Sequence, residues 1–149
     1  MSVIFNCLIN GANIKHVFSF GHQGSISKHS LIFNHLFMSS IQDFNEYRQR
    51  MNDVILSQDN KVIKRFFSLD NQTYEDGALP EVTKELLGLV ASMVLRCDDR
   101  VKYHLGRCYE LGVTKEQIYE ASSVALIVGG SIFIPHLRRA AEYWEELSL

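Results

Sequence analysis

The chain has 149 residues, a formal net charge of −2 and three cysteines. A single domain of this length buries an adequate core without disulfides or structural metal, and the small charge, with a pI of about 6.3, argues against a nucleic-acid partner. Cys7, Cys97 and Cys108 are an odd number at unrelated spacings, so we expect no disulfide framework and a reducing, cytoplasmic setting. Because no stretch holds the ~18 apolar residues of a membrane-spanning helix, we also expect no membrane partner.

The beginning of the chain differs in composition from the rest, since no Asp or Glu precedes Asp43. Four histidines lie in this part of the chain: His16, His22, His29 and His35. Their spacings of six or seven residues do not form a ligand pair on one helix face, so no metal site is expected. Ser39 or Ser40 could cap a following helix. We therefore hypothesise a weakly ordered extension over residues 1–37 and a helical domain over residues 38–149.

Helical periodicity dominates the second part of the chain. Apolar residues recur at intervals of three and four over 41–55, which predicts an amphipathic helix. A shorter helix is predicted over 61–67, followed by a polar loop over 69–77 that is rich in turn-forming residues. Pro80 then opens a further helix with a broad apolar face, because proline is tolerated in the first helical turn.

The chain is predicted to turn at Cys97-Asp98-Asp99, where acidic residues suit the positive end of a new helix, and this helix stops at Gly112. Thr114 to Gln117 read as a capping box. The helix that it opens is apolar almost all round and is predicted to lie in the core. Glycines at 129 and 130 and a proline at 135 separate it from a last amphipathic helix. With no clear strand pattern, the predicted fold is all-α, an antiparallel bundle of about five to six helices.

Cys97 is a candidate reactive thiol, because the N-terminus of a helix lowers the pKa of a cysteine. On a straight helix, residues 97, 100 and 104 share a face, and Cys97 and His104 are separated by roughly 10 Å along the axis. His104 therefore reaches position 100 more readily than it reaches Cys97. That position holds Arg100. An inert, half-buried cysteine is the plainer interpretation of Cys97.

Glu85 lies among apolar residues of the preceding helix, where an unpaired carboxylate would be costly. If the two helices pack antiparallel, Arg100 or His104 could be its partner. The alternative is a solvent-exposed Glu85 beside Lys84. Glu85, Arg100 and His104 together would make a polar pocket suited to an anionic group, since a guanidinium matches a carboxylate.

These residues carry a resemblance to the carboxymuconolactone decarboxylase family, and within it to the alkylhydroperoxidase D-like proteins. The stretch is "KELLGLVASMVLRCDDRVKYHLGRCYELGVTKEQIYEASSVALIVGGSIFIPHLRRA". Glu85, Cys97, His104, "GVTKEQI" and "VGG" match the family pattern of a Glu, a Cys-x-x-Cys-x-x-x-His, a capped helix and a Gly-Gly pair. The resemblance implies an all-α protomer that assembles into trimers or hexamers. It also implies peroxide reduction with Glu85 and His104 as proton relay and Cys97 as resolving cysteine, and it places Arg100 at the position of the attacking cysteine.

Three functions follow for this sequence. The first is a peroxiredoxin-type antioxidant, impaired by Arg100, that acts on peroxides through Cys97 with an external thiol or dithiol reductant. The second is a non-redox protein in which Arg100 binds a small carboxylate, with or without decarboxylase-like acid-base chemistry. The third is a catalytically inactive helical oligomer. We expect neither a metal nor another cofactor in any of them.

Overall fold

A computed structural model describes the backbone of residues 5–9, 12–16 and 28–149 and the side chains of residues 41–149. The chain divides into two compact units, Met1–Ile32 and Phe33–Leu149. In the first unit, β1 (Phe5–Ile9) and β2 (Ala12–His16) pair antiparallel. The sequence analysis did not predict these two strands. The expectation about the four early histidines concerns side chains outside the described part of the chain.

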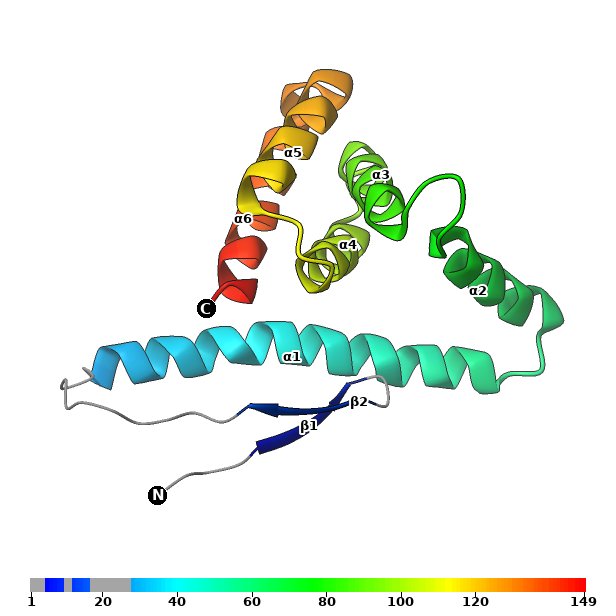
Figure 1. Cartoon of the computed structure of the whole chain (residues 1–149), viewed down its shortest axis with the longest axis horizontal. Helices are drawn as coiled ribbons and strands as arrows, with labels where there is room; N and C mark the ends of the chain where they lie inside the picture. The colour runs from blue at the N-terminus through cyan, green and yellow to red at the C-terminus, as the bar shows by residue number, and fades with distance from the viewer. Residues whose placement is uncertain (1–4, 10–11, 17–27) are drawn as a thin grey trace. The chain divides into compact units, whose positions relative to one another are not determined.

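Helix α1 (Lys28–Ser57) runs through the predicted start of the domain without interruption (Figure 1). The expectation that Ser39 or Ser40 caps a helix is wrong, because both residues lie inside α1. The boundary at residue 38 stays a prediction. The amphipathic pattern over 41–55 corresponds to the second half of this helix.

Helix α2 (Lys61–Tyr74) begins at a cap formed by Asn60, whose side-chain oxygen accepts from the backbone N–H groups of Val62 at 3.0 Å and Ile63 at 3.1 Å. Such a cap satisfies N–H groups that have no partner within the helix. The prediction of a helix over 61–67 is too short. The first part of the predicted loop over 69–77 is helical, and only the residues after Tyr74 form a loop.

Helices α3 (Glu81–Val94) and α4 (Asp98–Glu110) are joined by a tight turn at the predicted place. Arg96 has a left-handed backbone with φ 59°. Its N–H donates to the carbonyl of Met93 at 3.0 Å, and the N–H of Cys97 donates to that of Ser92, also at 3.0 Å. These two bonds satisfy the last carbonyls of α3. The turn therefore fixes Cys97 directly at the start of α4.

The end of α4 and the start of α5 (Lys115–Gly129) confirm two predictions. Gly112 ends the helix with φ 75°, a conformation that glycine adopts without cost. Thr114 and Gln117 form the capping box, each side chain accepting from the other residue's backbone N–H. A 3-10 turn, η1 (Ser131–Phe133), then leads into α6 (Ile134–Leu147).

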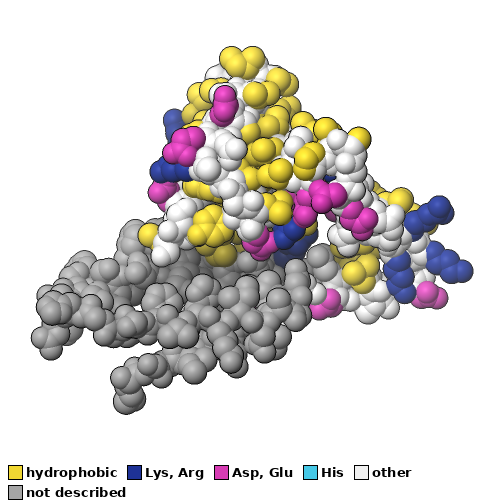
Figure 2. All heavy atoms as spheres, in the orientation of Figure 1, with side chains coloured by type: hydrophobic (Ala, Val, Ile, Leu, Met, Phe, Trp, Pro, Cys, Tyr) yellow, Lys and Arg dark blue, Asp and Glu magenta, His cyan; other side chains and the backbone are white. Residues whose placement is uncertain are grey.

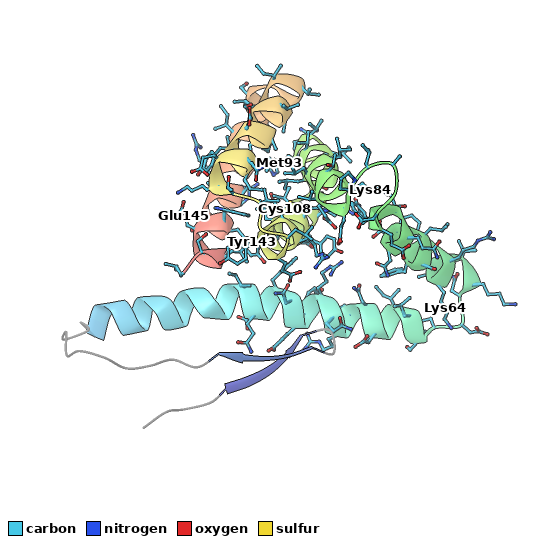
Figure 3. All side chains as sticks on the ribbon, viewed as in Figure 1. Lys64, Lys84, Met93, Cys108, Tyr143 and Glu145 are labelled. Atoms are coloured by element: carbon cyan, nitrogen blue, oxygen red, sulfur yellow. The ribbon has the colours of Figure 1, made fainter. Side chains whose placement is uncertain are left out.

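The core of the second unit lies where α3 packs against α4 and α5, and α4 packs against α6 (Figure 1). Met93 and Cys108 are fully buried and lie between these helices (Figure 3). The all-α fold class is confirmed. The expectation that the whole of α5 lies in the core is wrong, because Ile127 is 85% exposed, and Val124 and Val128 are exposed with it. None of the described helices is long and apolar enough to cross a membrane.

Candidate active site

The centre of the site is a buried pair of side chains, Glu85 of α3 and His104 of α4. Each is only 1% exposed, and Nδ1 of His104 lies 2.7 Å from Oε2 of Glu85. Because an ionised carboxylate can only accept, this nitrogen carries the hydrogen and donates it. The antiparallel packing of α3 and α4 therefore gives Glu85 the partner that the sequence analysis sought. Removing one member of such a buried pair typically costs about 3–5 kcal/mol.

Glycine at position 88 makes room for the imidazole. A Cβ at Gly88 would lie 2.6 Å from Cε1 and 2.9 Å from Nε2 of His104, and 2.7 Å from the hydroxyl of Tyr74. Real Cβ atoms essentially never approach other atoms so closely. The ring of Tyr74 lies 5.3 Å from the imidazole, centroid to centroid, and that of Tyr103 lies at 5.2 Å. The histidine is therefore enclosed by two aromatic rings and the bare backbone of α3.

A cation stands beside the buried carboxylate. Nε of Arg107 lies 4.0 Å from Oε1 of Glu85, on the side away from His104. The same guanidinium donates to Glu81 at 2.6 Å and to Glu110. Burial by itself lowers the pKa of Arg107, but the bonds to Glu81 and Glu110 outweigh it and hold the pKa above its ordinary value. Arg107 therefore stays charged and offsets part of the cost of burying Glu85.

Arg100 points to a different partner from those predicted. Its guanidinium donates to Oδ1 of Asp70 in α2 at 3.2 Å, and the arginine side chain is 47% exposed. The structure therefore brings Glu85 and His104 together and joins Arg100 to α2. An ion pair this exposed is worth roughly 0.2–1 kcal/mol.

Cys97 is half-buried and occupies the N-cap position of α4, with no side-chain hydrogen bond to the helix. The adjacent Asp98 accepts from Nδ1 of His136 at 2.8 Å and from Nε of Arg139 at 3.0 Å, which ties the start of α4 to α6. The acidic and basic neighbours of Cys97 are therefore engaged elsewhere, Asp98 with α6 and Arg100 with α2. The helix N-terminus remains as the local feature that favours a thiolate.

The sequence model of the carboxymuconolactone decarboxylase family matches residues 60–145. The chain belongs to this family.

Solved structures of relatives agree with this membership. TM1620 of Thermotoga maritima, a carboxymuconolactone decarboxylase family protein with a suggested role in the antioxidative response, is 53% identical. Its superposition covers 71% of this chain and 90% of that one, with a TM-score of 0.69. A second structure of TM1620 gives 72%, 94% and 0.71. A family protein of Legionella pneumophila is 25% identical over 78% of this chain and 97% of its own, with a TM-score of 0.55.

Curated relatives are more distant. An uncharacterized protein of Cupriavidus necator is 28% identical over 74 residues, which is 50% of this chain and 66% of that protein. An uncharacterized protein of Paracoccus denitrificans is 29% identical over 82 residues, 55% of this chain and 74% of its own. The similarity to curated proteins is thus confined to about half of this family member.

In this member of the carboxymuconolactone decarboxylase family, α2 adds two residues to the site that the sequence analysis did not identify, Asp70 and Tyr74. They are four residues apart and lie on one face of the helix. A signal existed, because Ile63, Phe67, Asp70 and Tyr74 are spaced by four, three and four and are all partly buried. The abundance of turn-forming residues in the same stretch concealed it.

Burial and the Glu85 carboxylate also change the acidity of nearby groups. Burial, followed by the charge of Glu85, raises the pKa of the Cys108 thiol to about 12. The pKa of Tyr103 is raised for the same two reasons. For Tyr74, burial acts first, and the charges of Asp70 and Glu85 add to it. Cys108 is therefore a protonated, inert core thiol at neutral pH, and both tyrosines keep their O–H groups.

Proposed function

We propose that this chain is a thiol-dependent antioxidant protein that reduces peroxides, and that Arg100 weakens this chemistry. The observation that carries the proposal is the buried Glu85–His104 pair, which has the hydrogen-bonded geometry of a proton relay. Family membership supports it, as does the 53% identity to a protein with a suggested antioxidative role.

The proposed reaction consumes two thiols per peroxide. The sulfur of a thiolate attacks the terminal oxygen of the hydroperoxide, the O–O bond breaks, and the alkoxide leaves as an alcohol after taking one proton. The cysteine becomes a sulfenic acid. One thiol of an external dithiol condenses with it, releasing water and forming a mixed disulfide. The second thiol of the dithiol then displaces the cysteine and leaves as a cyclic disulfide.

The position of the thiol determines how well the relay serves it. Residue 100 is one helical turn before His104, whereas Cys97 is seven residues before it, roughly 10 Å along the axis. In the natural chain Cys97 therefore reacts as a single thiol with little help from the relay. A thiol at position 100 would have both the relay and Cys97 as a resolving partner.

Peroxide consumption with dithiothreitol as donor tests the proposal in the natural chain, Arg100→Cys and Arg100→Ser. Both variants lose the same exposed ion pair with Asp70, so Arg100→Ser is the matched control. We expect Arg100→Cys to exceed the other two by about 100-fold, the low end of what a positioned general base contributes. Equal rates in Arg100→Cys and Arg100→Ser, with both folded, would refute the proposal.

Carboxylate binding by Arg100 has less support, because the guanidinium already bonds to Asp70. Melting temperatures measured with small carboxylates address this alternative, since a bound ligand raises the melting temperature by mass action. A rise that disappears in Arg100→Ser would favour it over peroxide reduction.

We also propose that the chain forms a homo-oligomer in a reducing, cytoplasmic compartment. Exposed apolar side chains gather toward the end of α5 and over η1, where Figure 2 shows a continuous yellow area. They are Val124, Ile127, Val128 and Ile132. Contiguous apolar surface of this kind is typical of subunit interfaces. Light scattering at micromolar concentration is expected to give a multiple of the 17.1 kDa chain mass, and a monomer would contradict this.

A further inference from the structure

One polar atom of the relay is left over. Nε2 of His104 is buried, and in the part of the chain that the structure describes it has no hydrogen-bond partner. Buried polar groups are nearly always paired, because an unmade hydrogen bond in the interior costs about 1–3 kcal/mol. This nitrogen faces the bare backbone of Gly88, and the hydroxyl of Tyr74 approaches the same point from α2.

The two atoms are complementary. Since Nδ1 of His104 donates to Glu85, Nε2 of the neutral ring carries the lone pair and accepts. The hydroxyl of Tyr74 donates, and its raised pKa, caused by burial and by Asp70 and Glu85, keeps the hydrogen in place at neutral pH. Both atoms lie within 2.9 Å of the position of the missing Gly88 Cβ, and no direct hydrogen bond joins them. One oxygen atom with hydrogen bonds of ~2.8 Å spans a gap of this size.

We propose that Tyr74 is a further substrate-binding residue, whose hydroxyl and Nε2 of His104 together hold an oxygen of a hydroperoxide. The inference rests on the proposed function and specifies its substrate contact. An acceptor and a donor side by side match a group that both donates and accepts, as the terminal O–H of a hydroperoxide does. A carboxylate, which only accepts, would meet the lone pair of Nε2 and be disfavoured.

The step follows from these roles. A thiol at position 100 gives its proton to Nε2, and the thiolate attacks the terminal peroxide oxygen. As the O–O bond breaks, negative charge grows on the departing alkoxide oxygen. The Tyr74 hydroxyl donates a hydrogen bond to that charge, and the imidazolium returns the proton to give the alcohol. Tyr74 itself is unchanged at the end of the step.

The test compares Tyr74→Phe with Tyr119→Phe, both in the Arg100→Cys background. Tyr119 is an exposed residue of α5, so it controls for the loss of a hydroxyl. Phenylalanine keeps the ring that packs on His104. We expect Tyr74→Phe to lower kcat/KM for tert-butyl hydroperoxide by about tenfold or more, as losing a donor to a developing oxyanion does, and Tyr119→Phe to leave it unchanged. Equal kcat/KM in the two variants would overturn the inference.

Alkylation separates a contact with peroxide from a structural effect. The thiol introduced by Arg100→Cys reacts with iodoacetamide, which has no hydroperoxide group to bind. Its alkylation rate is expected to be the same with Tyr74 and with Phe at this position. If alkylation falls as far as peroxide reduction, Tyr74 acts on the thiol environment and the inference is wrong.

A second measurement decides the matter if Arg100→Cys consumes no peroxide, a result that refutes the proposed function alone. The NMR signal of the His104 Cε1–H is followed during a hydrogen peroxide titration of the Cys97→Ser chain. A saturable shift that is lost in Tyr74→Phe would show that the two residues hold a peroxide oxygen without turning it over. The same response with Tyr74 and with Phe, including no response in either, would overturn the inference.

Discussion

The enclosure of His104 by Gly88 leads to opposite effects for two otherwise similar substitutions. Gly88 and Gly106 both lie inside helices, α3 and α4, and replacing a helix-interior glycine by alanine normally stabilises by roughly 0.5–1 kcal/mol. Gly106→Ala meets nothing within 4 Å and should gain this amount. Gly88→Ala would place its Cβ 2.6 Å from His104 and 2.7 Å from Tyr74. Overpacking of this kind costs about 1–3 kcal/mol.

The two variants should therefore differ by about 1–3 kcal/mol, the overpacking cost that only Gly88→Ala bears. For a domain of this size 1 kcal/mol shifts the melting temperature by roughly 4 °C. Calorimetry or urea unfolding of the natural chain, Gly88→Ala and Gly106→Ala provides the comparison. Gly106→Ala should melt higher than the natural chain and Gly88→Ala lower. If Gly88→Ala is stabilised as much as Gly106→Ala, His104 does not pack on Gly88, and the geometry of the site is wrong.

Three further predictions concern residues around the α3–α4 turn. Iodoacetamide at pH 8 should label Cys97 in the native protein and spare Cys108, whose pKa burial raises to about 12; mass spectrometry of both peptides measures this, and equal labelling before unfolding would contradict it. Burial tends to raise the pKa of Asp98, but hydrogen bonds from His136 and Arg139 outweigh it and hold the pKa below 3.8. The resulting stabilisation is full above pH 3.8 and is lost as pH falls through the lowered pKa. Asp98→Asn should thus lower the melting temperature at pH 6, by less than about 1 kcal/mol for so exposed a group, and the difference from the natural chain should shrink toward pH 2; a constant difference would argue against the ion pair. Arg96→Gly should stabilise by about 1 kcal/mol, because the left-handed φ of 59° strains a residue with a Cβ; urea unfolding that shows a loss would mean that the arginine side chain holds the turn.

The sequence was sufficient to predict the centre of the site. The twelve-residue spacing from Glu85 to Cys97 and the helix break after it require the following helix to return along the first. This return brings His104 to Glu85. Helix caps were also predictable, because Thr114, Gln117 and Gly112 act through local backbone geometry that needs no tertiary contact.

Other features depended on information that local patterns lack. The stretch after Phe67 contains Asp70 and several turn-forming residues, and contacts with α3 and α4 override their weak preference for a loop. The role of Arg100 was open for the same reason, since its partner Asp70 lies thirty residues away. The apolar surface of α5 predicted burial, but an apolar side chain does not reveal whether its own chain or another subunit covers it.

The central claim is that the buried Glu85–His104 pair is a proton relay for position 100. The most direct test is the kcat/KM of peroxide reduction in Arg100→Cys with and without His104→Gln. Glutamine can still donate a hydrogen bond to Glu85 but cannot exchange a proton near neutral pH, and circular dichroism and melting establish that the double variant is folded. The account predicts a loss of about 100-fold or more. An undiminished rate in the folded double variant would contradict it.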